Sequence, residues 1–344
     1  MSTYQRRLET DLKGLRNHVS GMANQVNTAL NLTVKAFLAG DKASLYQIVL
    51  DDLAINRASR ALDTECHRFV AKHLPVAKHL RFVSSILRLN IALERIGDYA
   101  VTMCRIGVRL NLPPPPHLSQ HLTDLHTQAG QMLEQACKAF LEDNVELAEK
   151  TKGTAKAIDT EYDGFFEQLT TDTNNLTALQ VVSWLSVLSQ VERVSDQAKN
   201  ICEEAVFVGT GRKKKPKVYK VLFIGDEKLT APLACSIGQR HWLEQGAFVA
   251  KTTNAQTLDM SDVEEAEALG LSLVKPTAFE SLQESPAEYH VVVDVRANRT
   301  QTIGIPFHTI YLCWDLSEES VAAMVPELRT RIRELMESLR GDEE

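Results

Sequence analysis

Two pairs of acidic residues with the same spacing stand inside segments that are otherwise apolar. Glu94 and Asp98 form the first pair, and Glu192 and Asp196 form the second. Side chains four residues apart lie on one face of a helix, so each pair presents two carboxylates about one turn apart. Carboxylate oxygens suit divalent or trivalent ions such as iron, manganese, magnesium or calcium, and they do not select zinc or copper(I). The pairs therefore predict metal binding through oxygen ligands.

Further oxygen donors occur at this spacing in the segments that precede the two pairs, namely Asp52 with Asn56 and Asp159 with Asp163. An acidic pair on one helix is most often a solvated face, and an arginine follows each glutamate as a ready ion-pair partner, at Arg95 and Arg193. The recurrence of the pattern at matching places, inside otherwise apolar helices, makes metal binding as well supported as that interpretation, and both stay open. Because no histidine belongs to the pattern, a redox di-iron enzyme is disfavoured.

The elements that would position these residues are long helices over residues 1–208. The first segment carries one apolar stripe at steps of three and four residues, which is typical of a bundle helix; its members are Leu8, Leu12, Leu15, Val19, Met22, Val26 and Leu30. Turn-forming residues predict breaks at 39–41, 74–75, 111–116, 142–144 and 170–175. The pattern predicts six helices in two sets of three, each roughly 25–35 residues long, as in antiparallel bundles.

The two sets of helices are related in sequence. VERVSDQAKNI at 191–201 is similar to LERIGDYAVTM at 93–103, and AKAIDTEY at 155–162 is similar to LAINRASR at 53–60. An internal repeat of this length predicts a duplicated three-helix unit. The expected organisation is a first repeat at 1–111, a second repeat at 117–208, a basic linker at 209–217 and a different domain at 218–344.

The region after the linker changes to an α/β pattern. Short runs rich in valine and isoleucine predict strands at 218–225, 247–253, 289–295 and 308–314, and an amphipathic stretch predicts a final helix near 317–339. Buried strands that alternate with helices indicate a small parallel sheet covered on both faces. The predicted fold class is therefore multidomain, with all-α duplicated three-helix bundles followed by a small α/β domain.

Composition and charge limit the classes of function. The chain has 344 residues, 44% hydrophobic and 24% charged, and a formal net charge of −7, which makes nucleic acid an unfavourable partner. No stretch is apolar enough for a membrane helix, and the charged N-terminus predicts no signal peptide. The six cysteines form no CxxC pair, so we expect reduced thiols and a cytoplasmic protein.

The segment LPVAKHLRFVSSILRLNIALERIGDYAV at 74–101 is similar to the signature stretch of the PhoU family, and the resemblance covers 1–208. The resemblance implies a negative regulator associated with the high-affinity phosphate transporter, with multinuclear metal clusters bound by Glu/Asp-x-x-x-Asp motifs. By position, the implied ligands are Glu94, Asp98, Glu192 and Asp196, supported by Asp52, Asn56 and Asp159. The sequence departs from the family pattern at His79, Thr102 and Ala155. Ala155 occupies the position in the second repeat that Asp52 occupies in the first.

The resemblance also implies the partners and the location of the protein. The expected partners are subunits of a phosphate ABC transporter, a phosphate sensor histidine kinase or both, with a second copy of the chain as a further candidate. The expected location is the cytoplasm, peripheral at the inner face of the membrane. Two alternatives remain open: an enzyme of the phosphatase or arsenate reductase type, and a bundle that stores or senses metal without a link to phosphate.

Residues 218–340 resemble low-molecular-weight phosphatases and arsenate reductases in framework segments, among them VLFIGDEKLTAPLACSIGQR at 221–240. That chemistry needs a thiolate after the first strand, an arginine that holds the oxyanion and an acid for the leaving group. The corresponding loop has a glycine at the thiolate position and no arginine; it contains Gly225, Asp226, Glu227, Lys228 and Thr230. Cys235 lies further along, where a buried cysteine is expected. The sequence therefore predicts a domain without catalytic activity.

Overall fold

The computed structural model divides into two compact units, residues 1–214 and 215–344. The structure describes residues 3–110, 116–171, 176–212, 217–225, 229–253, 260–273, 275–278, 289–296, 299, 305, 309–316 and 320–340. Within these ranges, every helix is too short or too polar to cross a membrane.

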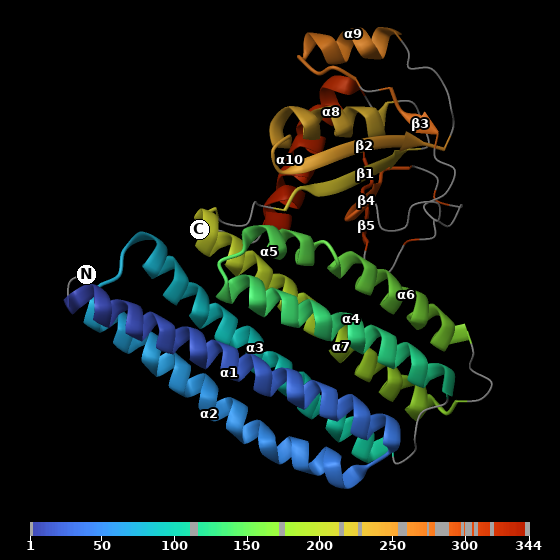
Figure 1. Cartoon of the computed structure of the whole chain (residues 1–344). Helices are drawn as coiled ribbons and strands as arrows, with labels where there is room; N and C mark the ends of the chain where they lie inside the picture. Colours follow the sequence, from blue (N-terminus) through green and yellow to red (C-terminus); the bar gives the residue numbers. More distant parts are fainter. Residues whose placement is uncertain are drawn as a thin grey trace. The chain divides into compact units, whose positions relative to one another are not determined.

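The first repeat consists of three long helices, as predicted (Figure 1): α1 (Thr3–Ala39), α2 (Lys42–His73) and α3 (Ala77–Leu110). Of the predicted stripe of α1, the residues from Leu15 to Leu30 are buried and Leu8 and Leu12 are partly buried, and the buried face continues to Phe37. Asp41 caps α2 because its carboxylate accepts the backbone N–H of Ser44 at 3.2 Å. At the other end of α2, Leu74 adopts the left-handed conformation (φ 45°), and a proline follows, which disfavours continuation of the helix.

The second repeat has four helices where three were predicted: α4 (Pro116–Leu141), α5 (Val145–Lys152), α6 (Ala155–Thr171) and α7 (Ala178–Thr210). The prediction of one continuous middle helix was wrong, because the chain breaks at Gly153 and Thr154. Glycine is about 1 kcal/mol less favourable than alanine inside a helix. Both the backbone N–H and the hydroxyl of Thr154 bond the carbonyl of Thr151, at 3.1 and 2.7 Å, which closes a tight turn between α5 and α6.

The two repeats share one hydrophobic core. Helix α3 packs against α1, α2 and α7, and α7 packs against α3, α4, α5 and α6. Aromatic contacts join the repeats, with Phe37 at 5.3 Å from Trp184 and Phe82 stacked on Phe140 at 5.5 Å between ring centroids. The duplicated halves therefore form a single folding unit. Helix α7 extends to Thr210, two residues into the predicted linker.

The second unit contains a parallel sheet in the order β3-β2-β1-β4-β5. Its strands are β1 (Tyr219–Gly225), β2 (Gly246–Thr252), β3 (Thr277–Ala278), β4 (Val291–Asp294) and β5 (Ile310–Cys313). All the pairs are parallel, and Val221 of β1 lies opposite Phe248 on one side and Val291 on the other. The four predicted strands are confirmed; the two-residue β3 was not predicted.

Three helices accompany the sheet: α8 (Thr230–Trp242), α9 (Met260–Ala268) and α10 (Val321–Arg340). All three contribute to the core that contains Val221 and Phe223 of β1. The opposite side of the sheet, with Leu222 and Ile224, packs against residues such as Ile305. Leu222, Ile224 and Val292 on this second side are fully buried, so both faces of the sheet are covered, as predicted; in the described residues the helices contribute to the first core only.

Candidate functional site

The structure brings the predicted ligands of the first repeat together between α2 and α3. Asp52 and Glu94 are half-buried, and Asp98 is exposed. Burial raises the pKa of Asp52, and the charge of Asp98 adds to this effect, while the hydrogen bond from Asn56 opposes it. Burial also raises the pKa of Glu94, together with the charges of Asp98 and Asp52. The three carboxylates are thus close enough to repel one another.

The carboxylate of Asp52 has a defined position over α3. The side-chain amide of Asn56 donates a hydrogen bond of 2.7 Å to Oδ2 of Asp52. A Cβ atom added to Gly97 would lie 3.1 Å from Oδ1 of Asp52, which is tighter than an ordinary contact. The missing side chain at Gly97 is therefore what lets this carboxylate approach the backbone of α3, between Glu94 and Asp98.

The acidic face of the second repeat matches the first in burial but not in its surroundings. Glu192 is half-buried and Asp196 is exposed, as are their counterparts on α3, and Asp159 on α6 is exposed. Burial raises the pKa of Tyr162, with further contributions from the nearby charges of Glu192 and Asp163. When Ile158-Asp159 is aligned with Ile55-Asn56, Ala155 stands at the position of Asp52; it is buried and offers no ligand atom.

Neither face is a closed metal site as it stands. Among the residues that the structure describes, no three His, Cys, Asp or Glu side chains are arranged to hold an ion. Of the two other departures from the family pattern, His79 is exposed, and Thr102 donates its hydroxyl to the carbonyl of Asp98 at 2.9 Å. The predicted residues of the first repeat lie close together but do not form such a group.

The predicted anion loop of the second unit begins at Gly225, the last residue of β1, whose carbonyl accepts the N–H of Thr253 at 3.0 Å. Asp226, Glu227 and Lys228 lie outside the described residues. Thr230 opens α8 and lines a cavity of about 80 Å³, together with Val295, Arg296, Trp314, Asp315, Leu316 and Met324.

Cys235 is buried inside α8, as predicted, and its thiol donates to the carbonyl of Phe248 at 3.3 Å. Burial raises the pKa of Cys235 to about 12. A thiol with that pKa remains protonated at neutral pH and is a poor nucleophile. Cys235 therefore cannot replace the absent loop cysteine.

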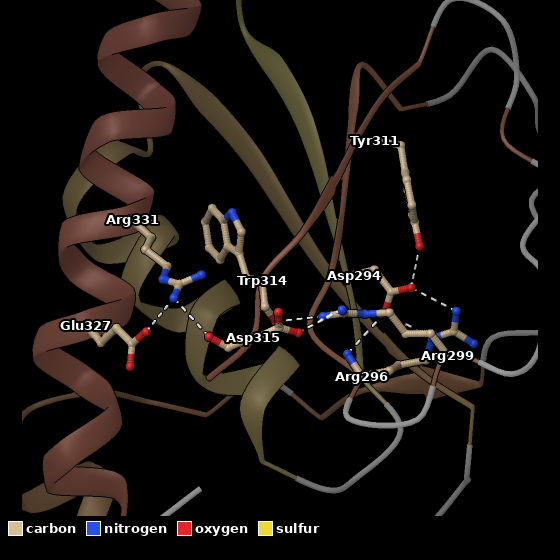
Figure 2. A network of polar contacts seen from close by, with 8 residues as sticks. All are labelled: Asp294, Arg296, Arg299, Tyr311, Trp314, Asp315, Glu327 and Arg331. Carbon is tan, nitrogen blue, oxygen red and sulfur yellow. Dashed lines mark hydrogen bonds and ion pairs between the residues drawn. The ribbon is translucent and has the colours of Figure 1, made fainter. Parts of the chain in front are cut away.

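Charged residues at the ends of β4 and β5 form a network that the sequence analysis missed (Figure 2). Arg296 and Asp294 are both buried, with 3% and 0% of their side chains exposed, and they make two bonds of 2.8 and 2.9 Å. The hydroxyl of Tyr311 donates to Asp294 at 2.5 Å. Burial would raise the pKa of Asp294, but the hydrogen bonds from Arg296 and Tyr311 outweigh it and hold the pKa below its ordinary value.

A second set of charges surrounds Asp315 beside the same cavity. Arg299 pairs with the carboxylate of Asp315 at 2.7 Å and donates to the carbonyl of Trp314 at 3.0 Å. Arg331 of α10 donates to the carbonyl of Asp315 at 2.9 Å and pairs with Glu327 (Figure 2). The arginines next to the cavity are thus already engaged by carboxylates of the protein.

One signal in the sequence pointed to this network. The motif Asp294-Val295-Arg296 lies at the carboxyl end of a buried strand, where parallel sheets commonly place functional side chains. The pairing of Asp294 with Tyr311, however, depends on the neighbouring positions of β4 and β5, in which Asp294 lies opposite Cys313. Residue spacing alone does not reveal that register.

Comparison with known proteins concerns the helical unit above all. The PhoU domain model matches residues 19–107 and again 122–205, which together make up about half of the chain. The phosphate-specific transport system accessory protein PhoU of Escherichia coli K12 is 30% identical over 195 residues, covering 56% of this chain and 81% of that protein. The double match falls on the two repeats that the sequence predicted.

Solved structures agree with this comparison. The crystal structure of PhoU from Pseudomonas aeruginosa is 28% identical and has a TM-score of 0.57, covering 59% of this chain and 99% of that chain. A structure described as an arsenate reductase in the phosphate binding state covers 36% of this chain and 99% of that chain, with 13% identity and a TM-score of 0.32. A similarity as weak as the latter transfers no ligand or reaction.

Proposed function

The chain belongs to the PhoU domain family, and from that premise we propose that it regulates phosphate uptake and phosphate-starvation signalling by binding other proteins. Its partners would be subunits of a phosphate ABC transporter, a phosphate sensor histidine kinase or both. The protein would act in the cytoplasm, at the inner face of the membrane. The observation that carries the proposal is the family match over both repeats, at the positions of the two acidic faces.

Metal binding is part of the proposal, through the acidic face of the first repeat. The donor set fits a hard cation, because Asp52, Glu94 and Asp98 supply only oxygen ligands. Gly97 leaves the space into which the carboxylate of Asp52 fits. A cation of iron, manganese, magnesium or calcium would neutralise the repulsion among the three carboxylates and fix α2 against α3.

We further propose that the second unit is a binding domain derived from a phosphatase or arsenate reductase fold and is not an enzyme. Gly225 stands where the nucleophilic cysteine is needed, and Cys235 is buried with its thiol protonated. Arg296 is paired with a buried carboxylate. The enzyme alternative predicts turnover of a generic aryl phosphate, whereas we expect none above that of a Cys235→Ser control. Turnover by the wild type alone would favour the enzyme.

An affinity pull-down of the full chain from native membranes tests the regulatory function. Wild type is compared with a variant in which Glu94, Asp98, Glu192 and Asp196 are replaced by alanine. A matched control replaces four exposed acidic residues elsewhere, namely Glu9, Glu134, Glu264 and Glu267. Partners are identified by quantitative mass spectrometry.

We expect wild type and control to enrich transporter or sensor-kinase subunits, and the variant of the acidic faces to lose them. Enrichment by all three proteins would retain the regulator and remove the metal from its mechanism. If none of them enriches such a partner, the proposed function is wrong, and a bundle that stores or senses metal becomes the better account.

A further inference from the structure

The connection between α2 and α3 exposes apolar side chains at the end of the helical unit where the N-terminus lies (Figure 1). Leu74 and Val76 are 78% and 74% exposed, and Leu80, in the first turn of α3, is 46% exposed; we call these three residues the apolar tip. Single exposed apolar residues are common, but three within seven residues form a patch of the kind that marks an interaction site. A helix connection does not require them, because the equivalent residues 171–175 of the second repeat read TDTNN.

The backbone of the connection has an unusual conformation. Leu74 and Ala77 are both left-handed, with φ of 45° and 49°, which is uncommon for residues other than glycine. The N–H of Leu74 bonds the carbonyl of Val70 at 2.9 Å, and the ring of Pro75 fixes the next φ. Strained backbone of this kind persists where the surrounding structure determines it, and it is common at functional sites.

Contacts with α1 fix the base of the connection. The hydroxyl of Tyr4 donates to the carbonyl of His73 at 2.9 Å, and Nε2 of His73 lies 2.7 Å from Oδ2 of Asp11. The ring of His73 also packs on Phe69, with 4.8 Å between the centroids. The connection is therefore anchored on the bundle while the apolar tip stays outside the core.

The segments on both sides of the apolar tip are basic. Residues 66–93 contain no aspartate or glutamate, although the whole chain has a formal net charge of −7. Lys72 lies two residues before Leu74, and Lys78 lies two residues after Val76. The lysines and arginines of this stretch are Arg68, Lys72, Lys78, Arg81 and Arg88.

Acids from other parts of the helical unit offset only part of this charge. Asp11 of α1 contacts both Lys72 and His73, at 2.5 and 2.7 Å. Asp143, which follows α4, lies 2.9 Å from Lys78 and 3.2 Å from Arg16. Each of these acids is shared between two basic side chains, so positive charge remains in excess around the apolar tip.

We propose that the connection between α2 and α3 docks on an anionic lipid surface. Leu74 and Val76 enter the membrane interface, and the neighbouring lysines and arginines face the lipid phosphates. Docking of this kind combines burial of apolar area with the attraction of basic residues to anionic headgroups. The inference rests on the membrane location contained in the proposed function, and it names lipid as a direct contact of this chain.

Flotation of the purified full chain with lipid vesicles tests the docking. Vesicles of phosphatidylcholine alone are compared with vesicles of phosphatidylcholine and phosphatidylglycerol. The variant Leu74→Ser/Val76→Ser is matched by Leu179→Ser/Val182→Ser on α7, where both residues are also exposed. We expect wild type and the matched control to bind the anionic vesicles. Leu74→Ser/Val76→Ser should bind them at least about tenfold more weakly, because less apolar area is buried.

Three further variants test the charge and the depth of the contact. Arg68→Gln/Lys78→Gln should weaken binding to the anionic vesicles about fivefold or more. Arg57→Gln/Arg60→Gln makes the same change of charge at exposed positions in the middle of α2 and should have little effect. Val76→Trp should bind more tightly than wild type, because tryptophan favours the membrane interface. Far-ultraviolet circular dichroism of each variant separates loss of binding from loss of folding.

A wild type that binds neither kind of vesicle would overturn the proposal, and so would equal binding by wild type and Leu74→Ser/Val76→Ser. Equal binding to neutral and anionic vesicles would overturn the role of charge. If wild type ignores vesicles while Leu74→Ser/Val76→Ser loses partners in the membrane pull-down, the apolar tip contacts a protein, and lipid docking is wrong. Because the vesicles contain no protein, tip-dependent binding beside a failed pull-down of wild type would reject the regulator and keep this inference.

Discussion

At the scale of residues, the two units use carboxylates in opposite ways. Burial and the mutual repulsion of Asp52, Glu94 and Asp98 raise the pKa of Asp52 and of Glu94, and they outweigh the opposing charges of Arg105 and Arg95. Asp294 is held between Arg296 and Tyr311, so its pKa is lowered despite burial. The first arrangement is suited to receive a cation, and the second is complete without a ligand.

The pair of Asp294 and Arg296 predicts a large effect of mutation on the second unit. Asp294→Asn leaves the buried guanidinium without its counter-ion, and breaking a buried pair in this way costs about 3–5 kcal/mol. Tyr311→Phe removes one hydrogen bond to the same carboxylate and should cost less. Urea unfolding followed by circular dichroism measures both. A loss in Asp294→Asn no larger than that in Tyr311→Phe would contradict the assigned role.

The same carboxylate predicts a dependence on pH. Because the folded pKa of Asp294 lies below the unfolded value of about 3.9, the unfolded state binds more protons between the two values. The stabilising contribution of Asp294 is therefore fully present above the unfolded pKa of about 3.9 and is lost as the pH falls through the folded pKa. Urea unfolding from pH 6 to pH 3 should show a steeper loss in wild type than in Asp294→Asn.

At the scale of elements, close helix packing depends on particular glycines. A Cβ on Gly107 of α3 would lie 2.7 Å from Phe37 of α1 and 2.8 Å from Leu45 of α2. By contrast, a Cβ on the exposed Gly14 of α1 would have no heavy atom within 4 Å. Gly107 therefore lies where α3 packs closely against both α1 and α2.

These two glycines predict opposite results for the same substitution. Gly107→Ala should destabilise the helical unit by about 1–3 kcal/mol through overpacking. Gly14→Ala should stabilise it by about 0.5–1 kcal/mol, because alanine is the better helix former. Thermal unfolding at 222 nm compares the two variants. Destabilisation by Gly14→Ala, or none by Gly107→Ala, would contradict this packing.

A metal between α2 and α3 predicts that chelation weakens the helical unit. A cation present at 100 times its dissociation constant stabilises the folded state by about 2.7 kcal/mol. For a unit of this size, that corresponds to a shift of several degrees, at about 2–4 °C per kcal/mol. Calorimetry with manganese and with EDTA measures the shift, and Glu94→Ala should abolish it. The same melting curve in both conditions would argue against the metal.

Long elements could be predicted from the sequence because each carries its own pattern. The stripe of α1 repeats over many turns, and the strands β1 and β4 are continuous apolar runs. The break between α5 and α6 was missed because one glycine inside a helical pattern is usually tolerated. Strand β3 has only two residues, which is too short to show any period.

The candidate sites, like the elements, could be predicted from the sequence only in part. The ligand spacing within α3 is a property of one helix and could be predicted from residue numbers. The approach of Asp52 to Gly97 depends on how α2 packs on α3, and the bond between Tyr311 and Asp294 depends on strand register. Contacts between separate elements have no local pattern, so only the structure could reveal them.

At the scale of the whole molecule, the chain combines a duplicated helical unit of the PhoU family with an α/β unit. In our proposal the helical unit recognises partners and binds metal through its acidic helix faces. The α/β unit lacks the loop cysteine and arginine, and its remaining arginines near the cavity are paired with carboxylates. We propose that this unit contributes binding and not catalysis.

Phosphate uptake by living cells tests the central claim most directly. The initial rate of radioactive phosphate uptake is measured in phosphate-rich medium, in cells with and without this chain and in cells complemented with the wild-type chain. A negative regulator of uptake predicts that cells without the chain keep a high-affinity uptake rate in rich medium and that complementation lowers it again. Identical uptake in all three strains would contradict a role in phosphate homeostasis.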